Sequence, residues 1–301
     1  MKKILSIFIL MFCIMLLTSC NSTNILFDSE LRELKFEYDE LVEKKEKLEE
    51  ELALLESKYE NYPVQIQEIK DRISKIDTEI TETYSLFSTL ENETLKGAVI
   101  VTHYLYEESG WGMFGKDEVV SGSLGSGFVI KADSLYYYIL TNNHVIEATE
   151  TADKETIYVY DYDLNKYAGT VLFKSSEYDM AVVRINKNTT LGELNVMKLA
   201  EKNPNKGDEV IAIGQPQGQV NSITIGNVDS YVSISVVSYK VIYHTAWIDH
   251  GNSGGMLINT NLEVVGINTW GGVNNSYTNH ESLSSPVEKI KEFLNNNSFA
   301  L

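Results

Sequence analysis

The sequence predicts a β-rich globular domain that follows a long α-helical segment. Apolar residues recur every seven positions between Leu31 and Leu90. After about Gly97 the pattern changes to short runs of β-branched and aromatic residues with a period of two. These runs do not alternate with long helical patterns, which disfavours a βαβ architecture. Many short strands instead favour a sandwich or closed barrels.

Residues 1–19 are expected to form a lipoprotein signal peptide. Two lysines precede an apolar run that is too short to span a membrane comfortably. The run ends in Leu17-Thr18-Ser19-Cys20, which resembles the bacterial lipobox, where cleavage precedes a cysteine that is then acylated. We therefore expect a lipid anchor at Cys20 on the extracytoplasmic face of the cell membrane, with residues 20–28 as a tether. The alternative is an ordinary secretory signal with an incidental cysteine.

Composition narrows the classes of function. The net charge of −18 disfavours nucleic-acid binding, because phosphates attract Lys and Arg. Cys13 would leave with the signal peptide, so Cys20 would be the one cysteine of the mature chain. A disulfide framework within the chain and a cysteine-based catalytic or metal site are then not expected.

The helical segment, residues 29–92, has the heptad pattern of a coiled coil, with mostly Glu and Lys between two apolar seam positions. Residues 91–96 are expected to join it to the next domain. One seam position carries Leu31, Tyr38, Lys45, Leu52, Tyr59, Ile66, Ile73, Ile80 and Phe87, and the other Leu34, Leu41, Leu48, Leu55, Tyr62, Ile69, Ile76, Thr83 and Leu90.

Pro63 interrupts the heptads and leaves two interpretations open. The register continues unbroken past the proline, and isoleucine occupies both seam positions after it, which favours trimers or tetramers over dimers. We therefore expect a homo-oligomer, a parallel trimer whose stalk of about 60 residues would be roughly 90 Å long. The alternative is an intramolecular hairpin that turns at Asn61-Tyr62-Pro63 and leaves a monomer.

Eight runs in the second part of the chain are predicted strands, and one helix closes the chain. Ser285 is expected to cap this helix and Pro286 to occupy its first position, with Val287, Ile290, Phe293 and Leu294 on its apolar face. The predicted strands are Ala98–Val101, Phe128–Ile130, Tyr136–Thr141, Thr156–Tyr160, Met180–Ile185, Val210–Ile213, Ser230–Val237 and Val264–Asn268.

A serine surrounded by glycines marks the candidate site. In Asp249-His250-Gly251-Asn252-Ser253-Gly254-Gly255 the glycines allow a sharp turn, and the N–H groups of Gly251 and Ser253 can point at one spot. Ser253 would be a nucleophile, and the two N–H groups an oxyanion hole. The plain alternative is a glycine-rich turn that happens to contain a serine.

Two further residues make the catalytic interpretation sharper. His144 follows a predicted strand, where a loop can present its imidazole. Asp179 immediately precedes an apolar strand, so it lies at the edge of a core and can be buried enough to orient an imidazole. Alone, each of the two is more often structural, but the order His, Asp, Ser predicts a catalytic triad.

Several motifs together resemble the protease domain of the HtrA/Deg family of trypsin-like serine endopeptidases. The resemblance covers roughly residues 97–298 and implies two antiparallel β-barrels with a short C-terminal helix and a site in the cleft between the barrels. It also implies His144 as general base, Asp179 as its orienting acid and Ser253 as nucleophile. The motifs are Gly125–Ile130, Thr141–Ile146, Asp179–Ile185, Gly207–Gly214, Gly251–Gly255 and Val265–Thr269.

The resemblance also sets expectations about ligands. Substrates would be proteins or peptides, neither a metal nor an organic cofactor is expected, and no PDZ domain is expected after the closing helix. The substrate pocket would be shaped by Trp247, Ile248, Thr269 and Trp270. None of these carries a carboxylate, which predicts small or medium aliphatic residues rather than Lys or Arg before the scissile bond.

Two other functions are weighed against this one. Gly251–Gly255 also fits the nucleophile elbow of α/β-hydrolases, but that fold needs a helix after the serine, and a strand-like Met256-Leu257-Ile258 follows here. A catalytically silent protease-like module for binding or adhesion would be expected to lack a residue of the triad, and all three are present.

Overall fold

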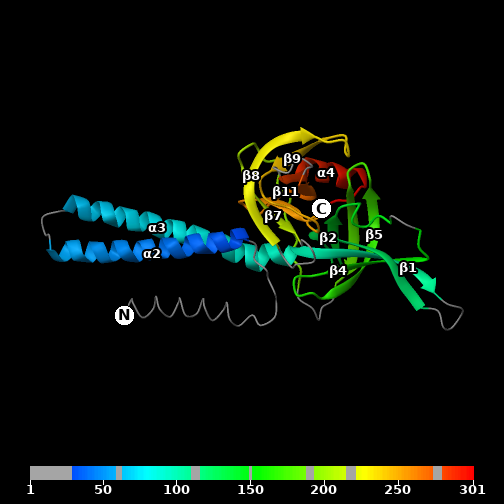
Figure 1. Cartoon of the computed structure of the whole chain (residues 1–301), viewed down its shortest axis with the longest axis horizontal. Helices are drawn as coiled ribbons and strands as arrows, with labels where there is room; N and C mark the ends of the chain where they lie inside the picture. The colour runs from blue at the N-terminus through cyan, green and yellow to red at the C-terminus, as the bar shows by residue number, and fades with distance from the viewer. Residues whose placement is uncertain are drawn as a thin grey trace.

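The computed structural model describes residues 29–58, 63–109, 116–148, 151–187, 193–214, 222–273 and 280–301. The predicted signal peptide, Cys20 and the tether lie outside the described residues. Two closed, six-stranded antiparallel barrels make up the body of the molecule, and two long helices project from it (Figure 1). The expected fold of two antiparallel barrels with a short C-terminal helix is therefore confirmed.

The first barrel closes in the order β1-β2-β3-β6-β5-β4, and the second in the order β10-β11-β12-β9-β8-β7. The first contains β1 (Ala98–Ser109), β2 (Lys116–Ala132), β3 (Tyr136–Thr141), β4 (Lys154–Tyr160), β5 (Lys166–Ser175) and β6 (Met180–Asn186). The second contains β7 (Glu209–Gly214), β8 (Ser222–Ser233), β9 (Lys240–His244), β10 (Met256–Asn259), β11 (Val264–Val273) and β12 (His280–Pro286).

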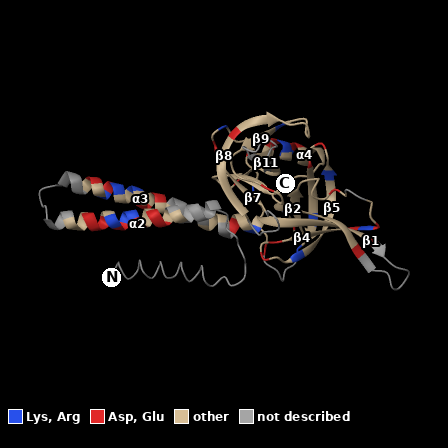
Figure 2. Ribbon diagram, in the orientation of Figure 1, with Lys and Arg blue, Asp and Glu red and all other residues tan. Residues whose placement is uncertain are grey.

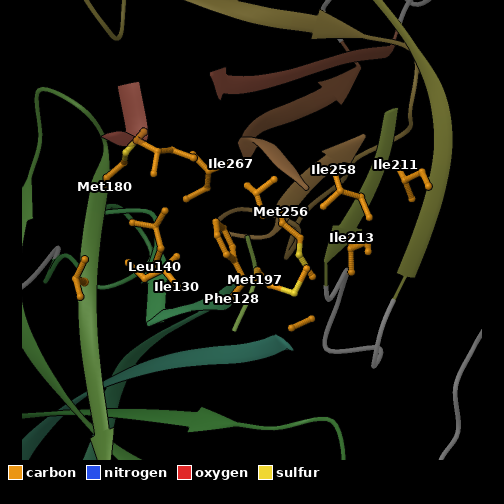
Figure 3. Close-up of a cluster of buried hydrophobic side chains, with 14 of the residues drawn as sticks. Phe128, Ile130, Leu140, Met180, Met197, Ile211, Ile213, Met256, Ile258 and Ile267 are labelled. Atoms are coloured by element: carbon orange, nitrogen blue, oxygen red, sulfur yellow. The ribbon is translucent and has the colours of Figure 1, made fainter. Parts of the chain in front are cut away.

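A large apolar cluster joins the two barrels. Phe128, Leu140 and Met180 enter it from the first barrel and are fully buried. Ile213, Met256 and Ile267 enter it from the second, and all lie in one continuous layer (Figure 3). Because burial of apolar surface is the main favourable term in folding, this shared core holds the two barrels in a fixed relation.

Apart from β10, whose first three residues were noted as strand-like, three of the twelve described strands were not predicted, and β12 shows why. Its buried side chains include Ser282, Ser284 and Ser285, which are at most 2% exposed. Each of these hydroxyls contacts a polar partner, such as the Asn268 side chain for Ser284. Both faces of this stretch are buried, and three of its side chains are hydrogen-bonded serines, so it has no alternation of apolar and polar residues and the strand signal fails. The other two strands are β5 and β9, and the predicted run Ser230–Val237 extends beyond β8, which ends at Ser233.

The C-terminal helix α4 (Val287–Asn296) has the predicted apolar face, but it begins differently. Its N-cap residue is Pro286, and no side chain of the cap donates or accepts a capping bond. Ser285 belongs to β12, so its predicted role as a cap is wrong. The side chain of Asn203 instead accepts a hydrogen bond of 3.1 Å from the N–H of Glu288 in the first turn.

The two long helices, α2 (Ser29–Lys58) and α3 (Pro63–Thr89), pack against each other as a hairpin (Figure 1). Lys45, the charged residue of the seam, donates to Asp77 on the facing helix at 2.5 Å. The seam side chains of each helix thus pack against the other helix of the same chain. The uninterrupted stalk of the trimer interpretation is therefore wrong, and the helices have the arrangement of the hairpin alternative. The apolar contact contains Leu41, Leu48, Leu52, Ile69, Ile73, Ile76 and Ile80.

The hairpin is joined firmly to the barrels. A π-helical turn (Leu90–Thr94) and a 3₁₀ turn (Leu95–Gly97) follow α3 without a break. Leu90 and Leu95 are at most 1% exposed and belong to the apolar cluster between the barrels. Charged residues of both signs occur along the described parts of the two helices (Figure 2). No helix in the described part of the chain is long and apolar enough to cross a membrane.

A buried histidine in the second barrel predicts acid sensitivity. His244 is 1% exposed, its Nε2 lies 2.9 Å from Ser284 Oγ, and burial lowers its pKa to about 4. An unfolded histidine has a pKa of about 6.5, so between pH 6.5 and 4 the unfolded chain binds a proton that the folded chain does not. From pH 7 to pH 5 the free energy of unfolding should therefore fall by about 2 kcal/mol on account of His244.

Urea unfolding at the two pH values measures this difference. His244→Gln should remove about 2 kcal/mol of the pH dependence, whereas the control His250→Gln, at an exposed position, retains His244 and should keep it. An equal pH dependence in wild type and His244→Gln would show that His244 is not responsible.

Candidate active site

His144 and Asp179 form a tightly bonded pair on the first barrel. His144 lies in the loop after β3, and Asp179 lies directly before β6. The Asp179 carboxylate accepts from His144 twice, from the main-chain N–H at 3.0 Å and from ring Nδ1 at 2.7 Å. Asp179 is 6% exposed, whereas 42% of the His144 side chain is exposed. The carboxylate is thus shielded, and it orients an imidazole whose other edge is accessible.

The backbone of Asp179 has a rare conformation. Its φ of 50° lies in the left-handed region, which only a few per cent of non-glycine residues adopt. The Asn142 side chain donates to the Asp179 carbonyl at 2.7 Å, so the residue two positions before His144 also holds the acid. Asn142 is fully buried, and this bond closes the loop that carries the histidine onto the loop that carries the acid.

Ser253 occupies a tight turn before β10. Gly254 has a φ of 88°, and a Cβ there would lie 2.1 Å from the Ser126 carbonyl, so glycine is required. Gly251 has a φ of 98°, its carbonyl accepts from Ser126 Oγ at 2.6 Å, and the Asn252 N–H donates to the Asp249 carbonyl at 2.9 Å. Within the described residues, the N–H groups of Gly251 and Ser253 donate to no acceptor. They are available to a bound oxyanion.

Contacts across the barrel interface bring Ser253 next to the histidine loop. The Ser126 N–H donates to the Ser253 carbonyl at 2.7 Å, and a Cβ on Gly125 would lie 2.6 Å from Val145 Cγ2 and 2.8 Å from the Ser253 carbonyl. A single strand of backbone therefore separates Ser253 from the neighbour of His144. The Ser253 hydroxyl donates to the Thr269 carbonyl at 3.1 Å.

The predicted pocket residues lie in three different surroundings. Thr269 is buried beside the site, where its hydroxyl accepts from Asn142 at 3.3 Å. Ile248 is 2% exposed, and a Cβ on Gly271 would lie 2.5 Å from the Ile248 carbonyl. Trp247 is 47% exposed, so its ring does not fill a buried pocket. Trp270 packs on a separate apolar cluster with Val237, Val241 and Leu283.

Sequence reasoning missed three residues that shape this site. Ser126 holds the Gly251 carbonyl, Asn142 joins the histidine and acid loops, and Gly271 packs on Ile248. Ser126 and Asn142 stand inside motifs that were noted, but their side-chain partners lie far away along the chain. Gly271 belongs to β11, beyond the end of the predicted strand Val264–Asn268.

Residues 125–267 match a family model described as a trypsin-like peptidase domain. Over this stretch, just under half of its length, the chain is similar to trypsin-like peptidases. The strand β10 follows the serine directly, which excludes the helix that an α/β-hydrolase elbow requires. The resemblance to HtrA/Deg proteases is supported by relatives that match part of the chain, and a solved HtrA-type structure shares the fold.

Three relatives show where this similarity lies. A probable serine protease do-like from Buchnera aphidicola is 36% identical over 151 residues, covering 49% of this chain and 30% of that protein. Serine protease Do-like HtrA from Bacillus subtilis is 33% identical over 192 residues, covering 59% and 41%. Periplasmic serine endoprotease DegP from Salmonella typhimurium is 36% identical over 153 residues, covering 49% and 30%. The aligned regions thus span well under half the length of these relatives.

A solved structure of an HtrA-type protease with a tripeptide has a similar fold. The TM-score is 0.54 at 24% identity, and the similarity covers 70% of this chain and 62% of that chain. At this identity the likeness concerns the fold alone.

Proposed function

We propose that this protein is a serine endopeptidase that hydrolyses peptide bonds of protein substrates through His144, Asp179 and Ser253. The observation that carries the proposal is the shielded Asp179 carboxylate, which accepts the Nδ1 proton of His144 at 2.7 Å beside a serine held in a glycine turn. This bond fixes the tautomer in which Nε2 of His144 has a free lone pair and can accept the proton of a serine hydroxyl.

Acylation begins with the Ser253 hydroxyl, which donates to the Thr269 carbonyl in the resting site. The hydroxyl turns toward His144, Nε2 takes its proton, and the oxygen forms a bond to the peptide carbonyl carbon. The carbonyl oxygen becomes an oxyanion, which the N–H groups of Gly251 and Ser253 stabilise. His144 then gives the proton to the leaving amine, the C–N bond breaks, and an acyl-enzyme remains.

Deacylation repeats these steps with water. His144 takes a proton from water, the resulting oxygen bonds to the acyl carbon, and a second oxyanion forms in the same place. The bond to Ser253 then breaks, Ser253 recovers its proton from His144, and a carboxylic acid leaves. Asp179 stays ionised throughout and stabilises the imidazolium that forms in each half of the cycle.

We further propose that the enzyme works outside the cytoplasm, anchored to the membrane through a lipid on Cys20, in protein quality control or processing. The supporting observations are the lipobox-like end of the apolar run and relatives that are named as periplasmic proteases. Cys20→Ala should release the protein from the membrane fraction or leave it unprocessed. Wild-type protein found unlipidated in the supernatant would contradict the anchor.

Reaction with a fluorophosphonate probe tests the proposed activity. An activated serine displaces fluoride from the probe, so wild-type protein should be labelled on the peptide that contains Ser253, as mass spectrometry would show. His144→Ala lacks the general base and should be labelled far more slowly. Wild-type protein that is folded and unlabelled would favour the silent binding module instead.

The pocket predicts a preference for small or medium aliphatic residues before the scissile bond. Ile248 is buried and packs directly on Gly271, and neither Trp247 nor Ile248 offers a carboxylate to a cationic side chain. Cleavage of a peptide library, read by mass spectrometry, should show Ala, Val and similar residues at that position. A profile dominated by Lys and Arg would refute this.

A further inference from the structure

The two peptide groups on either side of Asp179 are each held by a side chain from elsewhere in the fold. The carbonyl after Asp179 accepts from Asn142 at 2.7 Å. The carbonyl before it, that of Tyr178, accepts from the hydroxyl of Tyr239 at 2.8 Å. Together these bonds fix the orientations of both peptide planes, and therefore the left-handed backbone of Asp179, whose φ is 50°.

Tyr239 comes from the other barrel. It stands directly before β9, and Ser285 of β12 lies 2.9 Å from its hydroxyl. A tyrosine hydroxyl has one proton, and the Tyr178 carbonyl takes it, so Ser285 is the donor to Tyr239. Burial raises the pKa of Tyr239 to about 12, so the hydroxyl keeps its proton at neutral pH. The two hydrogen bonds thus point the Tyr239 hydroxyl toward the loop that carries Asp179.

The ring of Tyr178 reinforces the connection. It stacks on the Tyr239 ring with centroids 6.2 Å apart and planes at 27°. Its own hydroxyl donates to Glu292 at 2.6 Å and accepts from Asn296 at 3.0 Å, both on α4. Met180, on the other side of Asp179, is fully buried in the cluster between the barrels (Figure 3). The acid is thus flanked by residues that are fixed to the second half of the molecule.

We propose that Tyr239 is a positioning residue for Asp179, which acts across the barrel interface to set the geometry of the His144–Asp179 pair relative to Ser253. The inference rests on the proposed function, because it assigns Asp179 to the acid of the triad. His144 and Asp179 belong to the first barrel and Ser253 to the second, so the approach of base to nucleophile depends on how the barrels are joined. The Tyr239 bond joins them at the residue next to the acid.

Tyr239→Phe in the full chain removes the hydroxyl and keeps the ring. We expect kcat for a peptide substrate to fall roughly ten- to a hundredfold with KM unchanged, because small displacements of a catalytic group are costly. Tyr231→Phe is the matched control. Tyr231 on β8 is part-buried, and its hydroxyl also donates to a main-chain carbonyl, that of Pro204 at 2.7 Å. It should lose a similar amount of thermal stability and keep the wild-type kcat.

A second measurement does not depend on catalysis. In protein labelled with ¹⁵N-histidine, the Nδ1 proton of His144 that is bonded to Asp179 should give a low-field NMR resonance, assigned by its absence in His144→Gln. This resonance should shift or broaden in Tyr239→Phe and remain in place in Tyr231→Phe. Wild-type protein that shows the resonance but neither cleaves peptide nor reacts with fluorophosphonate would overturn the proposed function, and the NMR comparison would still decide the role of Tyr239.

Three results would overturn the inference. One is an unchanged resonance in Tyr239→Phe, whatever the rate. Another is a wild-type kcat in an active enzyme that carries this change. The third is an equal loss of kcat in Tyr239→Phe and Tyr231→Phe, which would reduce the effect to general destabilisation.

Discussion

Replacing Ser253 with alanine should reduce kcat for peptide hydrolysis by roughly 10⁶-fold while leaving the fold intact. The substitution removes the oxygen that forms the acyl-enzyme, and neither His144 nor the N–H groups of the turn can replace it. The structural loss is small, because the hydroxyl makes one hydrogen bond, of 3.1 Å, to the Thr269 carbonyl. Degradation of unfolded casein and the rate on a short peptide measure the effect.

Thermal unfolding provides the control for this variant. Loss of one hydrogen bond costs about 1 kcal/mol, so the melting temperature should fall by only a few degrees. Ser284→Ala serves as a comparison, since it also removes a buried hydroxyl of the second barrel, which contacts the side chains of Asn268 and His244. Casein cleavage by Ser253→Ala at near the wild-type rate would mean that Ser253 is not the nucleophile.

Replacing Asp179 with asparagine should reduce kcat by about 10⁴-fold. Asparagine keeps the shape, and its oxygen can still accept the His144 main-chain N–H that now lies 3.0 Å away. Its amide nitrogen would then face His144 Nδ1, where the carboxylate oxygen now lies at 2.7 Å. A donor in that place favours the imidazole tautomer with its proton on Nε2, which cannot accept the serine proton. The pH dependence of kcat measured beside the wild type would record this change.

Asp161→Asn is the matched control for the acid. Asp161 is also a buried carboxylate of the first barrel, and it accepts from main-chain N–H groups in a turn and from the Tyr167 hydroxyl at 2.8 Å. Its replacement should lower stability without a comparable loss of kcat. Near-wild-type turnover by Asp179→Asn would remove Asp179 from the catalytic group.

The sequence predicted those parts of the molecule whose signal is local. Phe128, Met180 and Ile213 stand in apolar runs, so their strands were found, and His144, Asp179 and Ser253 stand in motifs with a fixed order. The strand β12 was missed because three of its buried side chains are serines. Tyr239 gave no signal either, because its role depends on a bond to a residue 61 positions earlier in the chain.

In the helical segment the sequence signal was present, but it did not identify the packing partner. Its heptads correctly predicted helices with an apolar seam, but a heptad states only that a seam is covered, not by which chain. Lys45 marked the ambiguity, since a charge in a seam needs a partner, and the structure supplies Asp77 from the same chain at 2.5 Å. The choice between a hairpin and a continuous stalk depended on residues 59–62, which lie outside the described residues.

The hairpin shortens the distance from the membrane at which an anchored enzyme could act. The start of α2 and the end of α3 both lie beside the barrels, and the end of α2 and the start of α3 lie away from them (Figure 1). With a lipid on Cys20, the chain between the bilayer and the start of α2 would be only the residues from Cys20 to Ser29. This segment would be about 30 Å long when fully extended. Ser253 would then lie within a few nanometres of the lipid surface. Membrane-bound chains and proteins just leaving the membrane would come within its range, whereas substrates farther out would have to diffuse to it.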